Sequence, residues 1–400
     1  MNDRYNVHLH IFTGKCAPKD FLQVGLKWGD GMSTALKWLF LTKPVSWIIT
    51  QAAGAIPKKK LQFLKIGVMA TQAEVFKEIL EAYRKSHYTD MRFVALTIDM
   101  DYMTDSKNKP SQDFNSQVLE VYKLKKVYAN ELFPFYGIDP RNPDTLRFVN
   151  LKVLLQNKVF AGIKLYPPNG FFPFDPRLDA LYAYAEANNV PIMTHCTRGG
   201  SYYVGKNIWS IIPDYPVSLD QNHPVMQKVY ARIKAYKTTL LSEFKTNGRI
   251  CNVFTHPENY LPVLDKYPNL RLCIAHMGGD VEILGAGHFD SKLAKQHNDC
   301  TKLEAGTCSW YETIKKEILV AKYPNTFTDI SYSICDAASM KIVNKDIAAG
   351  NIDPNRILFG TDYFMVAQED EELKVVAVGE KELAAHFPDM MGKNIQQYLY

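Results

Sequence analysis

The chain has 400 residues, 46% hydrophobic and 12% aromatic, so it is long enough to bury a large core. Its formal net charge of +5 is small for this length and its basic residues are scattered, which argues against nucleic acid as a partner. The seven cysteines are odd in number and form no Cys-x-x-Cys pair, which argues against a disulfide framework or a zinc ribbon. We therefore expect a reducing compartment and a cytoplasmic location.

The first predicted strand, residues 6–12, begins almost at the N-terminus and leaves no room for a signal peptide. Successive side chains of a strand alternate between its faces, so His8 and His10 are expected on one face and Val7, Leu9 and Ile11 on the other. Two imidazoles at this spacing can bind the same metal ion, at about 2.0–2.1 Å from each nitrogen.

An insertion follows, whose most apolar stretch, residues 35–56, is interrupted by two lysines and a proline. This interruption argues against a membrane span. The tryptophans of the insertion are expected to cover a pocket or to form a homodimer interface, and both alternatives remain open; they are Trp28, Trp38 and Trp47.

Short apolar strands then alternate with helical patterns to the end of the chain. The predicted strands cover residues 6–12, 93–99, 133–138, 160–166, 190–195, 270–276, 326–331 and 356–362. Such alternation implies parallel pairing with right-handed crossovers, and eight units predict a (β/α)8 TIM barrel in a single domain, residues 1–400. A doubly wound open sheet is the alternative. The surplus length is assigned to insertions at about 13–60, 198–223 and 280–307.

Polar residues stand at the ends of these strands. His195, His276 and Asp362 each end a predicted strand, as His8 and His10 end the first. The carboxyl ends of barrel strands meet at one mouth, so these five side chains are predicted to share one pocket.

Several segments resemble, in order and spacing, the amidohydrolase superfamily: His8-Leu9-His10, Gly162-Ile163-Lys164-Leu165, Thr194-His195, Ala275-His276-Met277-Gly278-Gly279 and Ile357-Leu358-Phe359-Gly360-Thr361-Asp362. They are most similar to the amidohydrolase-related branch, which includes aminocarboxymuconate semialdehyde decarboxylase, aromatic acid decarboxylases and lactonases.

The resemblance implies one divalent metal, with ligands at His8, His10, His195 and Asp362, and places His276 beside the metal-bound water or the substrate. Three imidazoles and a carboxylate suit Zn²⁺ first, with Mn²⁺ or Fe²⁺ as alternatives. A bound metal lowers the pKa of water from 15.7 to about 7, and Asp362 is expected to accept the proton of that water.

Lys164 shares its strand face with Gly162 and Tyr166 and therefore points inward. We expect Lys164, Tyr166 and Arg198 to bind substrate, with Arg198 placed to grip a carboxylate through two hydrogen bonds. The resemblance also offers a second metal bridged by a carboxylated Lys164, which is the less favoured alternative.

Three functions remain open for a small-molecule substrate. The preferred one is metal-dependent hydrolysis of an ester, lactone or amide. The second is non-oxidative decarboxylation of an aromatic or unsaturated acid, which inward arginines would favour, whereas a roomy pocket would favour hydrolysis. The third, a ligand-binding barrel without chemistry, predicts substituted ligand positions, and none of the five is substituted.

Overall fold

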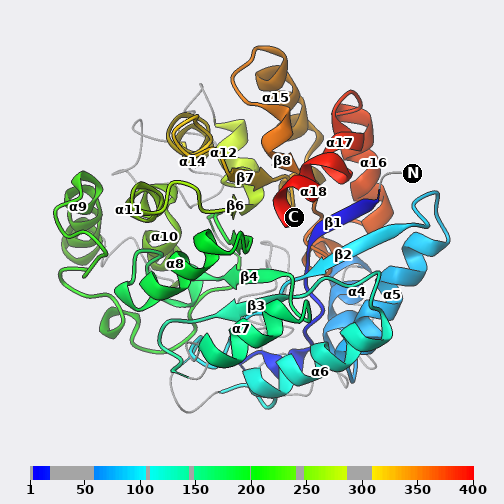
Figure 1. Ribbon diagram of the computed structural model, residues 1–400, viewed down its shortest axis with the longest axis horizontal. Coiled ribbons are helices and arrows are strands. Elements are labelled where there is room, and N and C mark those ends of the chain that lie inside the picture. The colour runs from blue at the N-terminus through cyan, green and yellow to red at the C-terminus, as the bar shows by residue number, and fades with distance from the viewer. Residues whose placement is uncertain are drawn as a thin grey trace.

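The computed structural model describes residues 3–18, 58–104, 109–143, 148–198, 200–239, 247–285 and 309–400. Within these ranges eight strands alternate with helices along the chain, as predicted (Figure 1). The strands are β1 (Arg4–Leu9), β2 (Met91–Ala95), β3 (Phe135–Ile138), β4 (Gly162–Leu165), β5 (Ile192–Thr194), β6 (Leu272–Ile274), β7 (Thr326–Asp329) and β8 (Ile357–Leu358).

The strands form a closed ring. Strands β3 to β8 pair in chain order in one parallel sheet, and β1 pairs in parallel with β2. Isolated bridges join Leu96, just after β2, to Phe135 of β3, and Leu9 of β1 to Tyr363, just after β8. These bridges close the two gaps between the sheets, so the (β/α)8 TIM barrel is confirmed and the open doubly wound sheet is excluded.

Helices surround the strands on the outside of the ring (Figure 1). Those described are α4 (Lys58–Gly67), α5 (Gln72–Arg84), α6 (Phe114–Val127), α7 (Phe148–Gln156), α8 (Asp179–Ala187), α9 (Pro224–Thr239), α10 (Asn247–Thr255), α11 (Leu261–Lys266), α12 (Asp280–Leu284), α14 (Trp310–Thr313), α15 (Ala337–Ala348), α16 (Glu372–Glu382), α17 (Phe387–Met391) and α18 (Lys393–Leu399).

Local sequence explains where these helices begin and which face they bury. Thr71 caps α5 by accepting a hydrogen bond from the backbone N–H of Glu74, and Val75, Ile79 and Tyr83 fall on its buried face. At the end of the chain, the ring of Tyr398 in α18 packs against two phenylalanines, Phe135 of β3 and Phe327 of β7. The C-terminal helix therefore covers the end of the barrel that lies opposite the strand carboxyl ends.

Every strand except β3 ends earlier than the sequence predicts. β6 stops at Ile274 and β8 at Leu358, so that His276 and Asp362 lie in turns, each with a φ of 69°. In these turns the backbone N–H of His276 donates to the side chain of Asp329, at Oδ1, and that of Asp362 donates to the carbonyl of His8 in β1.

Most of two predicted insertions, together with Trp28, Trp38 and Trp47, lies outside the described residues. The helical segment that begins at Trp310 is short. It consists of α14 followed by one wide turn, Ile314–Ile318, in which the N–H of Leu319 bonds the carbonyl of Ile314. In the described parts of the chain, every helix is too short or too polar to cross a bilayer.

Candidate metal centre

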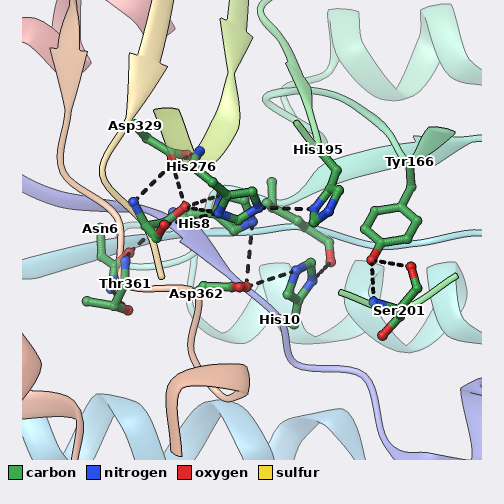
Figure 2. Close-up of polar contacts among 12 residues, drawn as sticks. Asn6, His8, His10, Tyr166, His195, Ser201, His276, Asp329, Thr361 and Asp362 are labelled. Carbon is green, nitrogen blue, oxygen red and sulfur yellow. Dashed lines mark hydrogen bonds and ion pairs between the residues drawn. The ribbon is translucent and has the colours of Figure 1, made fainter. Parts of the chain in front are cut away.

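His8 of β1 and His10, the residue just after β1, point to the same place, as predicted (Figure 2). His8 Nδ1 lies 2.9 Å from Asp329 Oδ2, and His10 Nδ1 lies 3.1 Å from the carbonyl oxygen of Leu96. Each Nδ1 thus faces an oxygen acceptor, so Nδ1 carries the proton and Nε2 presents its lone pair to the interior. A histidine held by its second nitrogen in this way is typical of a metal ligand.

Asp362 lies between these rings. Its Oδ1 is 3.3 Å from His10 Nε2 and 3.7 Å from His8 Nε2. His276 approaches from β6, and one ligand atom each of His8, His276 and Asp362 lies within 4.8 Å of the others. All three side chains are buried, so their polar atoms converge on a small space that is shielded from bulk water.

His195 completes the group from the end of β5. Its Nδ1 lies 3.0 Å from His276 Nε2, and its ring stands against the ring of Tyr166. The hydroxyl of Tyr166 donates to the carbonyl of Ser201 and accepts from the N–H of that residue, at 2.8 and 3.1 Å. Tyr166 therefore fixes the loop after β5 over the edge of His195 (Figure 2).

The end of β7 supplies polar partners for two of the histidines. Asp329 Oδ1 accepts hydrogen bonds from the backbone N–H groups of His276 and Ser331, at 2.8 and 3.1 Å. The hydroxyl of Ser331 lies 3.0 Å from His8 Nδ1 and 2.8 Å from His276 Nδ1. No role was predicted for these two residues from the sequence. Asp329 and Ser331 are two positions apart at the same barrel mouth, so they share a strand face, and that position is the signal that could have identified them.

Burial and neighbouring charges set the protonation of the group. Burial, followed by the charge of Lys164, holds the pKa of His8 well below its usual value, and burial lowers the pKa of His276. Burial alone would raise the pKa of Asp362, but His10 and the other imidazoles outweigh it and lower that pKa. These directions favour neutral imidazoles at His8 and His276 and an ionised carboxylate at Asp362, which are the protonation states that a divalent cation needs.

Lys164 lies in the barrel near this group and is 1% exposed. Burial lowers the pKa of its amine to about 8, against the opposing charges of Asp329 and Asp362. Its Nζ has no hydrogen-bond partner among the described residues, and Lys164 is not one of the side chains that line the pocket.

A pocket of about 80 Å³ opens onto His10, His195, His276 and Asp362. Its other walls combine apolar and aromatic side chains with polar ones. The first group is Phe12, Ile98, Tyr166, Tyr332 and Met365, and the second includes Thr197, Ser201, Asp280 and Gln368. Arg198 also lines it. The guanidinium of Arg198 pairs with Glu282 of α12 and lies over the ring of Trp310, 4.5 Å from its centroid.

The structure thus brings together all five residues that strand position predicted. The resemblance placed His276 beside the metal-bound water or the substrate. In the structure, one of its ring nitrogens lies within 4.8 Å of ligand atoms of His8 and Asp362. Tyr166 and Arg198 line the pocket as expected of substrate-binding residues, whereas Lys164 lies behind its wall. The ligand set remains a prediction.

Comparison with known proteins agrees with the sequence resemblance. The sequence model of a family described as amidohydrolase matches residues 77–288, more than half of the chain. The chain belongs to the amidohydrolase family. It is accordingly an enzyme of the amidohydrolase superfamily, a group of TIM barrels. No curated protein matches the sequence of this chain.

Solved structures similar to this chain include three that match over most of both chains. A dihydroxybenzoic acid decarboxylase from a Polaromonas species, with manganese and 2-nitroresorcinol, is 14% identical over 100% of this chain and 97% of its own, at a TM-score of 0.48. A manganese-bound 5-carboxyvanillate decarboxylase from Novosphingobium aromaticivorans is 10% identical over 100% and 96%, at 0.49. A putative amidohydrolase from Staphylococcus aureus is 15% identical over 82% and 92%, at 0.47.

The residues of the cluster fit a divalent cation. Among the described residues, His8 Nε2 and Asp362 Oδ1 are buried without a hydrogen-bond partner, although burying such atoms unpaired is costly. Both atoms point into the space that the imidazoles surround, and a cation there would bind them. Imidazole nitrogen with one carboxylate oxygen suits Zn²⁺, Mn²⁺ or Fe²⁺.

Proposed function

We propose that this chain is a divalent-metal-dependent decarboxylase of a small aromatic or unsaturated carboxylic acid. The observation that carries the proposal is the pocket that ends on the buried histidine and aspartate cluster, with aromatic rings of Phe12, Tyr166 and Tyr332 and the guanidinium of Arg198 in its walls. The residue pattern alone favours hydrolysis, and inward arginines are the expected sign of decarboxylation. Aromatic rings beside an arginine suit a flat, acidic substrate.

His8, His10, His195 and Asp362 would hold the metal, with Zn²⁺ or Mn²⁺ as the first ions to test. Bound there, the ion would orient the carboxylate of the substrate and an adjacent oxygen and offset their charge. Phe12 and Tyr166 would pack against the faces of the substrate. These contacts exclude water and fix the ring relative to His276.

His276 is the candidate proton donor. When CO₂ leaves, its bonding electron pair stays on the carbon, which must then receive a proton. Nδ1 of His276 carries its proton toward Ser331, so Nε2 is the atom directed at the cluster; it would first take up a proton from solvent and then pass it to that carbon. Arg198 would bind a further oxygen of the substrate, because its guanidinium is held at the wall by Glu282 and Trp310.

Hydrolysis of an ester, lactone or amide is the second candidate. It is favoured by Asp362, whose lowered pKa keeps the carboxylate ionised and able to accept a proton from an attacking water. The two reactions differ in their products, since decarboxylation releases CO₂ and hydrolysis releases an acid with an alcohol or amine.

The test is an assay of the chain reconstituted with Mn²⁺ or Zn²⁺. Hydroxybenzoates and unsaturated acids are screened for CO₂ release, and lactones, esters and amides for acid release. CO₂ release that is abolished by chelation and restored by metal supports the proposal. Acid release alone would establish the second candidate, and a chain that binds no metal would contradict both.

A further inference from the structure

Asp329 and Ser331 contact two of the site histidines through one connected set of hydrogen bonds (Figure 2). Their positions at the end of β7 are 0% exposed, so each proton in the set must go to a protein acceptor. The chemistry of the groups therefore determines where each proton lies.

The proton count begins at Asp329, because its carboxylate can only accept. Oδ1 receives the N–H of His276, the N–H of Ser331 and the hydroxyl proton of Ser331. Oδ2 receives the proton on His8 Nδ1. Since the Ser331 hydroxyl has given its single proton to Asp329, its oxygen can only accept from His276 Nδ1.

The positions of these protons also determine whether Nε2, the opposite nitrogen of each ring, carries a proton or a lone pair. With Nδ1 protonated, the Nε2 atoms of His8 and His276 carry lone pairs directed at the cluster. His276 Nε2 then accepts from His195 Nδ1, 3.0 Å away, which leaves the lone pair of His195 on its Nε2. The proton on His8 thus follows from Asp329, and those on His276 and His195 follow from Asp329 together with Ser331, whose backbone carbonyl, 3.1 Å away, also accepts from His276 Nδ1.

We propose that Asp329, with Ser331 as its relay, is a positioning residue that sets the tautomers of His8, His276 and His195 and thereby makes the site able to bind metal. The proposal deepens the proposed function and rests on its metal site. Asp329 does not line the pocket, so it acts through the histidines and not on the substrate.

The main test is Asp329→Asn in the full-length chain. Either orientation of an asparagine amide places its NH₂ group against a donor, at His8 on one side or at His276 and Ser331 on the other. We expect the affinity for Mn²⁺ or Zn²⁺, measured by competition with a chelating indicator, to fall about 10–100-fold. Long-range ¹H–¹⁵N NMR of the metal-free chain should show loss of the Nδ1-protonated form of His8.

Ser331→Ala provides a second variant in case Asp329→Asn does not fold. Alanine leaves the Asp329–His8 contact and the Ser331 backbone carbonyl in place, 3.1 Å from His276 Nδ1. Because that carbonyl still accepts from Nδ1, we expect His8 and His276 to keep their Nδ1-protonated forms in the NMR spectrum and the metal affinity to fall less than in Asp329→Asn.

Thr328→Val is the matched control. Thr328 is buried beside Asp329, but its hydroxyl bonds the carbonyl of Ile274 and contacts no site histidine. This variant should keep wild-type metal affinity and tautomers. If Asp329→Asn folds, and both its tautomers and its metal affinity match those of the control, the proposal is wrong. NMR detects the tautomers in the absence of metal. A wild-type chain that has the expected tautomers but binds no ion would therefore contradict the proposed function, while the hydrogen-bond assignment would still hold.

Discussion

The backbone N–H of Asp362 donates a hydrogen bond of 2.8 Å to the carbonyl oxygen of His8. This bond joins the first strand to the turn after the eighth and places the aspartate side chain between His8 and His10. Because the bond uses the backbone, it survives substitution of the side chain. The site can therefore be altered at Asp362 without opening the barrel.

Asp362→Asn should abolish turnover and leave the fold intact. The amide keeps the shape of the side chain but loses the negative charge that favours a cation, so metal affinity should fall at least tenfold. Metal content after dialysis, kcat and circular dichroism measure the three effects. Turnover at the wild-type rate would exclude a role for Asp362 in the reaction.

Gly200→Ala should weaken the site by direct contact. Gly200 has a φ of +81°, and an added Cβ would lie 3.1 Å from Cε1 and 3.2 Å from Nε2 of His195. The methyl group would press on the metal-facing nitrogen, so we expect lower metal affinity and lower kcat, beyond a backbone cost of about 1 kcal/mol.

Gly350→Ala is the control for that prediction. Gly350 has a similar φ of +72°, but nothing lies within 4 Å of an added Cβ. Gly350→Ala should lower the free energy of unfolding, measured in urea, by the same backbone cost. Its kinetic constants should equal those of the wild type. Equal metal affinity in the two variants would show that Gly200 does not limit space at His195.

Arg198→Lys should raise KM about tenfold with little change in kcat. Lysine keeps the charge but loses both the planar fork that pairs with Glu282 and the stacking over Trp310, so the substrate contact loses its fixed direction. Arg232→Lys is the matched control, since Arg232 pairs with Glu258 away from the pocket. Steady-state kinetics that change equally in both variants would count against substrate binding by Arg198.

Glu372→Gln should stabilise the chain at neutral pH. Burial, aided by the charge of Asp362, raises the pKa of Glu372 from 4.5 to about 7, despite hydrogen bonds from Thr361 and Tyr83. Between these pH values the folded chain holds a proton that the unfolded chain has lost. The wild-type free energy of unfolding therefore falls as pH rises across this window, and stays lower above it.

Glutamine accepts the same two hydrogen bonds and does not ionise. The difference in unfolding free energy between Glu372→Gln and wild type should grow from pH 4.5 to 7, by about 2 kcal/mol, and then level off. Urea denaturation of the metal-free chains at several pH values measures it. Parallel curves for the two proteins would refute the raised pKa of Glu372.

The sequence was sufficient to predict the barrel, because alternation of short apolar strands with helices leaves few arrangements. It also predicted that His8, His10, His195, His276 and Asp362 meet, because each lies at or just beyond a strand end. It did not reveal Asp329, since an acidic residue at a strand end has many structural uses. The positive φ values at His276 and Asp362 depend on hydrogen bonds to distant residues, and local sequence does not encode those.

Tyr398 packs against Phe135 and Phe327 across the base of the barrel, and all three rings are buried. These three rings close the base of the barrel, so an ion must enter and exit the proposed centre through the mouth. Substrate uses the same route. A bound substrate or product analogue should therefore trap the ion kinetically and slow its extraction by a chelator.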